Sequence, residues 1–278
     1  MILGVSNIAW APEERLAAYD LMEAAGVTGL EIAPALFFSR ADDPFEPDNT
    51  AVANALNEIE SRGLSLVSMQ SLLFGVYGAN LFGDDAARNA FENGMHRAIN
   101  LAGRLGIPNL VFGSPAQRRI PEGMTFSDAF DQAVGTFHRL GDRASSAGTV
   151  ISVEPNPVAY GTNFLNTLDE VELFVEKVAH PSVALILDLG AMHMNNTFDT
   201  VIERLETLAP NLNHVHVSEP QLAPAPDDKT ALAPILAELQ RIRYRRAVSI
   251  EMRRTDFGLA TLEMRIAALM RAAKGVAI

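Results

Sequence analysis

The chain has 278 residues and no cysteine, which excludes disulfides, thiolate zinc sites, iron–sulfur clusters and cysteine nucleophiles. Its 22 basic and 34 acidic residues give a net charge of −12, which argues against a partner bound through a nucleic-acid backbone. No apolar run approaches the ~20 residues of a membrane span, and the start MILGVSNIAW is not a signal peptide, so we expect a cytoplasmic protein with no membrane partner.

Short runs rich in valine, isoleucine and leucine alternate with longer amphipathic segments along the whole chain. Such runs are typical of parallel strands buried on both faces. Strands are predicted at 2–6, 29–33, 65–70, 109–113, 150–154, 183–188, 213–218 and 247–252. Helices are predicted at 12–25, 48–62, 85–105, 126–147, 167–178, 198–208, 228–241 and 257–273. Ser127 and Thr167 are the predicted start signals of two helices, and Glu170 completes a capping box with Thr167.

Eight strand–helix repeats of about 35 residues each predict an α/β fold, the (β/α)8 TIM barrel. The rival is a doubly wound open sheet, which usually carries a glycine-rich turn after its first strand. Here that turn reads SNIAWAPEER, without a G-x-G-x-x-G motif. With no linker and no shift in composition, residues 1–278 are expected to form a single domain.

Polar side chains stand at the ends of most predicted strands. In a barrel the carboxyl ends of the strands meet at one face, where the active site lies. The spacing is 34 residues from Glu154 to Asp188, 28 from Asp188 to His216 and 35 from His216 to Glu251, so four successive strands each deliver one group. The strand-end residues are Glu31, Gln70, Glu154, Asp188, His216, Glu219 and Glu251.

The period of two within these strands turns the chosen residues toward the barrel axis. Glu154, His216 and Glu251 share the inward face with Ser152, His214 and Ser249, respectively. Converging carboxylates repel one another without a cation, and an oxygen-rich set with one imidazole suits Mn²⁺, Mg²⁺ or Co²⁺. A strand-end glutamate can instead serve as a salt-bridge partner, and His214 is expected to be a hydrogen-bonded core residue.

The segments GLEIAP, ISVEPNP, LILDLGAMH, HVHVSEP and VSIEMR resemble the xylose-isomerase-like TIM-barrel superfamily of sugar phosphate isomerases and epimerases, along essentially the whole chain. In that family's ketose 3-epimerases a Glu, Asp, His, Glu set binds one divalent metal, often Mn²⁺. The resemblance maps this set to Glu154, Asp188, His216 and Glu251. It also implies that Glu154 and Glu251 are the catalytic acid–base pair, passing a proton at C3 through an enediolate on the metal.

The chain departs from the epimerases at three positions. Ala191, Leu222 and Tyr160 stand where the epimerases carry a histidine, an arginine and a second glutamate, so the substrate stays open. Arg118 is a candidate bidentate ligand for a carboxylate or phosphate, and Trp10 for stacking on a sugar. The substrate-binding candidates are Trp10, Glu31, Gln70, Arg118, Asn156, Tyr160, His193, Glu219 and Arg253.

The leading hypothesis is an enzyme, a divalent-metal-dependent isomerase or epimerase of a sugar or sugar derivative. Its cofactor is expected to be one metal ion, Mn²⁺ first, with Mg²⁺, Co²⁺ or Zn²⁺ as alternatives. Its partner is a small sugar-derived substrate, and a homo-oligomer is compatible with the sequence. A lyase that dehydrates a keto-polyol needs the same metal and base. An abasic-site endonuclease with three zinc ions and a non-catalytic sugar-binding barrel are weaker alternatives.

Overall fold

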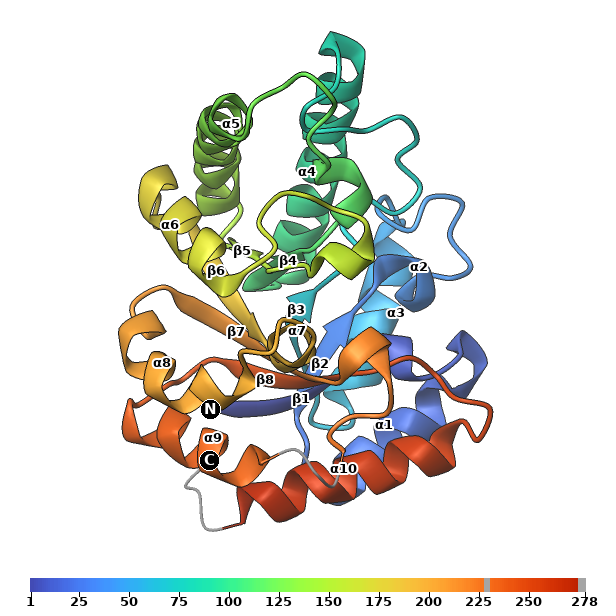
Figure 1. Ribbon diagram of the computed structural model, residues 1–278. Coiled ribbons are helices and arrows are strands. Elements are labelled where there is room, and N and C mark those ends of the chain that lie inside the picture. Colours follow the sequence, from blue (N-terminus) through green and yellow to red (C-terminus); the bar gives the residue numbers. More distant parts are fainter. Residues whose placement is uncertain (228–230, 275–278) are drawn as a thin grey trace. The chain divides into compact units, whose positions relative to one another are not determined.

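Eight parallel strands form a closed barrel in which they follow one another in chain order, which confirms the predicted TIM barrel. The computed structural model describes residues 1–227 and 231–274 (Figure 1). Every predicted strand is present, with each boundary within one residue of its expected place. The strands are β1 (Ile2–Ser6), β2 (Gly29–Ile32), β3 (Ser65–Met69), β4 (Asn109–Phe112), β5 (Val150–Val153), β6 (Val183–Asp188), β7 (Leu212–Ser218) and β8 (Ala247–Glu251).

Helices follow the strands, as the apolar periodicity predicted. They are α1 (Arg15–Ala25), α3 (Asn49–Glu60), α4 (Asp85–Leu105), α5 (Phe126–Ser146), α6 (Leu168–Val178), α8 (Val201–Leu208), α9 (Leu232–Arg241) and α10 (Leu259–Ala273). Two short helices were not predicted, α2 (Pro34–Phe37) and α7 (Leu189–Met194). The helix expected at 228–241 begins at Leu232, and residues 228–230 lie outside the described part of the chain.

The starts of α5 and α6 test the predicted caps. Thr167 caps α6 in a capping box with Glu170, as expected. The prediction for Ser127 is wrong, because Thr125 has the extended backbone of an N-cap and its hydroxyl accepts from the Asp128 amide at 3.1 Å. Ser127 already lies inside the first turn of α5, so it is not the N-cap.

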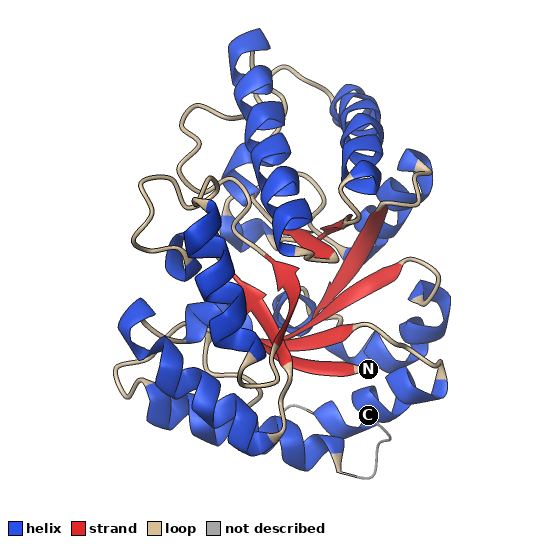
Figure 2. Cartoon of the chain, turned by 180° about the vertical axis from the view of Figure 1, so that it is seen from behind, coloured by secondary structure: helices blue, strands red, loops and turns tan. Residues whose placement is uncertain are grey.

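The chain divides into two compact units, and the single-domain organisation stays a prediction. The first unit comprises Met1–Val67 and Asp188–Ile278, and the second comprises Ser68–Leu187. In the first unit β1 pairs with both β2 and β8, and β7 pairs with β8. In the second unit β4 pairs with β3 and β5, and β5 pairs with β6. The helices of each unit lie outside its strands (Figure 2).

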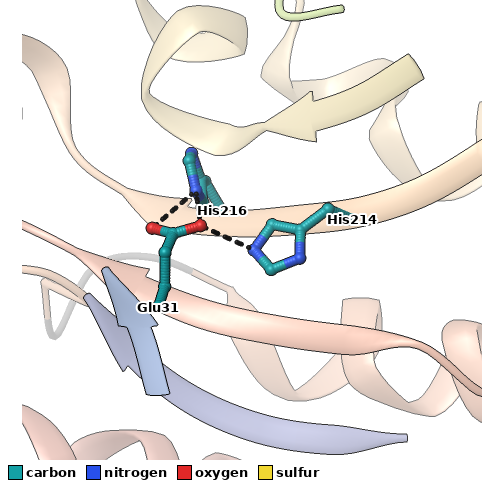
Figure 3. A group of neighbouring side chains, drawn as sticks. All are labelled: Glu31, His214 and His216. Carbon is teal, nitrogen blue, oxygen red and sulfur yellow. Dashed lines mark hydrogen bonds and ion pairs between the residues drawn. The ribbon is translucent and has the colours of Figure 1, made fainter. Parts of the chain in front are cut away.

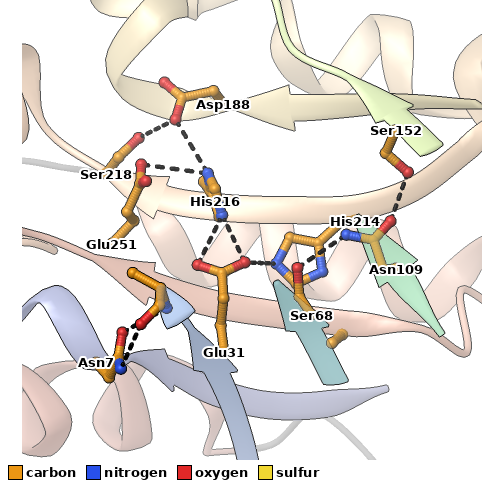
Figure 4. Close-up of polar contacts among 12 residues, drawn as sticks. Asn7, Glu31, Ser68, Asn109, Ser152, Asp188, His214, His216, Ser218 and Glu251 are labelled. Carbon is orange, nitrogen blue, oxygen red and sulfur yellow. Dashed lines mark hydrogen bonds and ion pairs between the residues drawn. The ribbon is translucent and has the colours of Figure 1, made fainter. Parts of the chain in front are cut away.

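The two faces of a strand in the second unit carry different side chains. Phe112 of β4 packs edge-on against Phe91 of α4 and Phe137 of α5, with ring centroids 5.8 and 4.9 Å away. Such pairs add ~0.5–1.5 kcal/mol each beyond the area they bury. Asn109, also on β4, instead donates to Ser68 at 2.9 Å and accepts from the Ser152 hydroxyl (Figure 4). Polar residues therefore form a hydrogen-bonded layer of their own.

Among residues 1–227 and 231–274, no helix combines the length and the apolar character needed to cross a bilayer.

Candidate metal centre

Three of the four predicted ligands converge in the first unit. Asp188 ends β6, His216 lies in β7 and Glu251 ends β8 (Figure 4). His216 Nδ1 lies 3.2 Å from Glu251 Oε2 and 3.6 Å from Asp188 Oδ2. One ligand atom from each residue lies within 4.8 Å of the other two, and the residues are only 7%, 0% and 6% exposed, respectively. The neighbouring strands β7 and β8 thus bring residues that are far apart in the sequence to one point.

Asp188 is held at this point by hydrogen bonds to both of its carboxylate oxygens. Its Oδ2 accepts from the Ser218 hydroxyl at 2.8 Å, and its Oδ1 accepts from the Ala191 amide and so caps α7. The Ser218 hydroxyl also accepts from the Gly190 amide at 2.9 Å. Because both oxygens keep a lone pair after one hydrogen bond, the carboxylate is fixed in direction without losing its capacity to bind a cation.

Gly190 allows the close approach that this network needs. A Cβ on residue 190 would lie 2.9 Å from the main-chain carbon and oxygen of Glu219 and 3.0 Å from Ser218 Oγ. The obstructing atoms at Glu219 are backbone, so a side chain at 190 would push α7 away from the end of β7. The glycine two positions after Asp188 is therefore required by packing.

Glu31 ends up beside two histidine rings. Its carboxylate is 0% exposed, with Oε2 3.0 Å from His216 Nε2 and 3.3 Å from His214 Nε2 (Figure 3). Burial by itself would raise the pKa of Glu31, but the rings of His216 and His214 beside its carboxylate hold that pKa well below the usual range. Burial lowers the pKa of His214. Glu31 is thus a buried carboxylate stabilised by imidazole, and its predicted contact with substrate stays a prediction.

The backbone near Glu31 is held by hydrogen bonds to the side-chain amide of Asn7. The Asn7 side chain accepts from the Ala33 amide at 2.7 Å and donates to the Ala33 carbonyl at 3.3 Å. This pair of bonds ties the chain after β1 to the chain after β2, where the backbone ladder has ended (Figure 4). The position of Glu31 is therefore fixed by backbone and side chain together.

The fourth predicted ligand, Glu154, follows β5 in the second unit. Its Oε2 accepts from the Asn156 amide group at 3.1 Å. A Cβ on Gly113, which follows β4, would lie 2.5 Å from the same oxygen. The glycine after β4 therefore leaves the space that the Glu154 carboxylate occupies.

Arg118 also lies in the second unit and is 0% exposed. Its Nη2 donates to the main-chain oxygens of Glu154 at 2.9 Å and Leu165 at 3.2 Å. Loss of solvation in this setting lowers the pKa of Arg118 to about 10. Its observed role is to bind the loop that carries Glu154, and its predicted contact with a substrate anion stays a prediction.

The remaining substrate-binding candidates have separate surroundings. Trp10 is 3% exposed and packs edge-on against Tyr19, which is a core contact. The His193 ring stacks on Phe198 with centroids 3.7 Å apart. Glu219 accepts from the Asp227 amide at 2.9 Å. Three more are spread over the two units: Gln70, buried after β3; Tyr160, exposed in a 3-10 turn; and Arg253, exposed after β8.

The donor set in the first unit fits a hard divalent cation. When His216 Nε2 holds the ring proton toward Glu31, Nδ1 and two carboxylate oxygens face one another as three acceptors within 4.8 Å. Buried acceptors that face one another repel unless a cation lies between them. Two oxygens and one imidazole nitrogen match the preferences of Mn²⁺ or Mg²⁺ better than those of a thiolate-binding metal.

Sequence reasoning missed Ser218 and Asn7 as parts of the site. Ser218 follows His214 and His216 at a spacing of two, so the same period that pointed those histidines inward predicts its direction. Asn7 carries no such signal, because it follows the last residue of β1 and acts on a strand that is 26 positions away in the sequence.

Several solved structures share the fold of this chain. A 3-keto-D-glucoside 4-epimerase from E. coli is 18% identical, with a TM-score of 0.76 over 98% of this chain and 99% of that one. A D-psicose 3-epimerase is 18% identical, with a TM-score of 0.77 over 99% of both chains. A family 2 AP endonuclease from Brucella melitensis is 20% identical, with a TM-score of 0.69 over 94% of this chain and 97% of that one. At these identities the likeness shows the fold alone.

The sequence was also compared with curated proteins and with protein families. A search of curated proteins gave no significant match. A comparison with protein families matched residues 19–274 to the xylose isomerase-like TIM barrel family. Because that match spans most of the chain, the protein belongs to the xylose isomerase-like TIM barrel family.

Proposed function

We propose that the protein is a divalent-metal-dependent isomerase or epimerase of a sugar or sugar derivative. The observation that carries this proposal is the buried convergence of Asp188, His216 and Glu251 in the first unit. The likeness of the fold to a 3-keto-D-glucoside 4-epimerase and a D-psicose 3-epimerase supports a keto-sugar as the class of substrate.

Glu154 is the proposed fourth ligand. It follows β5, the strand before β6 in the barrel order, and the strands of such a barrel present their carboxyl ends at one face. Asn156 donates a hydrogen bond to its carboxylate, and the absence of a side chain at Gly113 leaves room for it. Such positioning is expected of a functional side chain. Three carboxylates and one imidazole favour Mn²⁺ as the physiological ion.

The chemistry is proton transfer beside a carbonyl group. A divalent cation bound by these residues would polarise the carbonyl oxygen of the sugar and stabilise the negative charge that develops there. Glu251 removes the proton from the carbon next to the carbonyl, and Glu154 returns a proton to the opposite face. For an epimerase, protonation on the opposite face of the same carbon inverts its configuration.

The residues around the two glutamates would set the choice of substrate. Ala191, Leu222 and Tyr160 replace a histidine, an arginine and a glutamate of the ketose 3-epimerases, so we infer that the hydroxyl pattern recognised here differs from theirs. The proposed substrate contacts are Trp10, Gln70, Arg118, Asn156, Tyr160, His193, Glu219 and Arg253.

The metal is tested first, by titration of the chelator-treated protein with Mn²⁺ in a calorimeter and a thermal-shift assay. We expect one ion per chain and stabilisation of ~2.7 kcal/mol when Mn²⁺ stands at one hundred times its Kd. Asp188→Asn should weaken binding strongly, whereas Glu60→Gln, on the exposed face of α3, should leave it unchanged. Absence of any Mn²⁺, Mg²⁺ or Co²⁺ binding would refute the proposal.

The chemistry is tested separately in D₂O, with D-psicose and D-fructose as probes. An isomerase or epimerase introduces one deuterium into the recovered sugar, and ¹H NMR identifies the carbon. Glu251→Gln should reduce turnover by ~10²–10⁴-fold, the usual contribution of a general base. A product lighter by one water would identify a dehydratase instead. Near-native turnover by Glu251→Gln with metal bound would contradict the two-glutamate mechanism.

A further inference from the structure

The two ring nitrogens of His216 have different partners. Nε2 faces the Glu31 carboxylate, with 3.0 Å to Oε2 and 3.1 Å to Oε1. Nδ1 faces the other way, 3.2 Å from Glu251 Oε2 and 3.6 Å from Asp188 Oδ2. Figure 4 shows the ring standing between Glu31 on one side and the two other carboxylates on the opposite side. Both sides consist of acceptors, so the position of the single ring proton decides what the site can bind.

We propose that Glu31 is a positioning residue that fixes the tautomer of His216, with the proton on Nε2 and the Nδ1 lone pair directed at the metal centre. This inference rests on the proposed function, because it assigns a role within the same metal site. A neutral imidazole has one N–H donor and one acceptor. A carboxylate at hydrogen-bond distance from Nε2 selects the Nε2–H form and leaves Nδ1 as the ligand atom.

Glu31 lies beside two buried histidine rings in the first unit. Its carboxylate is 0% exposed, and both of its oxygens lie within hydrogen-bond distance of His216 Nε2. The second ring beside it, His214, is also 0% exposed and places Nε2 3.3 Å from Glu31 Oε2 (Figure 3). His214 thus presents a second nitrogen to the oxygen that His216 contacts, and the two rings confine the carboxylate from both sides.

Glu31, His214 and His216 also meet the distance requirement of a second metal site. That reading conflicts with the first centre, because one histidine would have to give a lone pair to each of two ions and lose its ring proton altogether. The hydrogen-bonded arrangement needs only the neutral ring. The geometry therefore points to one metal ion per chain, with Glu31 acting through His216.

The tautomer is measured directly, on metal-free wild-type protein labelled with ¹⁵N-histidine, by two-bond ¹H–¹⁵N correlation NMR. His216→Asn removes one set of cross-peaks and so assigns the His216 ring. We expect a protonated Nε2 and an unprotonated Nδ1 for His216. A protonated Nδ1 would overturn the proposal. This readout needs neither a metal, nor turnover, nor a Glu31 variant that folds.

Variants of Glu31 test the consequence for binding. Glu31→Gln offers an N–H as well as an oxygen to Nε2 and so no longer selects one tautomer. We expect its Kd for Mn²⁺ to rise by ~10–100-fold, the usual effect of losing the carboxylate behind a metal-bound histidine. Glu31→Asp keeps the charge and should recover part of the affinity, and Glu60→Gln serves as the matched control on an exposed helix.

The outcomes separate this proposal from the proposed function. Glu31→Gln with an unchanged His216 tautomer and an unchanged Kd would overturn the positioning role even if the wild type binds Mn²⁺. Two Mn²⁺ ions per chain would overturn it in favour of a second metal site. If the wild type binds no divalent metal but shows the Nε2–H ring, and Glu31→Gln shifts it, Glu31 sets the tautomer while the proposed function fails.

Discussion

The Ser218 hydroxyl donates to Asp188 Oδ2 over 2.8 Å and at the same time accepts from the Gly190 amide over 2.9 Å. One side chain therefore links the end of β7 to the carboxylate that ends β6 and to the first turn of α7. The relationship matters because Asp188 must keep its direction while its oxygens remain able to bind a cation.

Replacing Ser218 by alanine should weaken both links. The buried Gly190 amide loses its acceptor, so we expect a loss of ~1–3 kcal/mol in the free energy of unfolding. Asp188 loses a donor that orients it, so the Kd for Mn²⁺ should rise by ~10-fold or more. Urea unfolding and calorimetric titration measure the two effects. Ser146→Ala, which removes an exposed hydroxyl from α5, is the control. Equal behaviour of the two variants would contradict the role given to Ser218.

Gly113→Ala should affect Glu154 more than it affects the fold. The added Cβ would lie 2.5 Å from Glu154 Oε2, which is the far end of a flexible side chain and can move aside. We therefore expect the unfolding free energy to change by less than ~1 kcal/mol, while Mn²⁺ binds ~10-fold more weakly because a metal-ligating carboxylate has been displaced.

Gly135→Ala is the matched control for Gly113→Ala. Gly135 lies within α5, where a Cβ has only the Arg139 guanidinium at 3.8 Å, and alanine there should stabilise the helix by ~0.5–1 kcal/mol without changing metal affinity. Wild-type Mn²⁺ affinity in Gly113→Ala would show that Glu154 is not a ligand.

Glu14→Gln should reveal a pH-dependent part of the stability. Glu14 pairs with Arg254 through two bonds of 2.7 and 3.0 Å, and the Arg254 bond together with the Ala11 amide lowers the pKa of Glu14 to about 2. A carboxyl whose pKa is lower in the folded state stabilises the protein above the unfolded pKa of ~4.3, and this contribution disappears as the pH falls toward 2.

Urea unfolding of wild type and Glu14→Gln at several pH values checks this. We expect a small deficit of the variant at pH 7, because the pair is partly exposed and solvent screens it, and the deficit should shrink below about pH 4 and vanish near pH 2. Glu13→Gln, which changes a neighbouring exposed carboxylate, is the control. A deficit that grows toward acid would reverse the sign and refute the assignment.

The periodicity of the sequence was sufficient to predict the barrel, because each strand is an apolar run and each helix has an apolar stripe. It placed Asp188, His216 and Glu251 at strand ends, where the structure brings them together. It could not predict α7, because Asp188 is both the last residue of β6 and the N-cap of α7. No loop residues separate the strand from the helix. It also misassigned the N-cap of α5 to Ser127. The N-cap is Thr125, two positions earlier, and its hydroxyl accepts from the Asp128 amide.

The contact of Glu31 with His216 shows the limit of reasoning from a single sequence. The two residues are 185 positions apart, and a glutamate at a strand end looks the same whether it faces a ligand or a histidine. The roles of Glu154 and of the proposed substrate contacts also depend on positions that no local pattern encodes.

The pairing of β1 with β8 has a consequence for the order in which the chain matures. During synthesis β1 emerges before the other strands of the barrel, yet its second neighbour is β8, and the Arg254 partner of Glu14 lies 240 positions after Glu14. Residues 68–187, by contrast, form a contiguous unit whose strands pair among themselves. A nascent chain therefore carries an unpaired edge of β1 until β8 has been synthesised. Because open strand edges invite pairing with other chains, this is the interval in which the protein most needs shielding by chaperones.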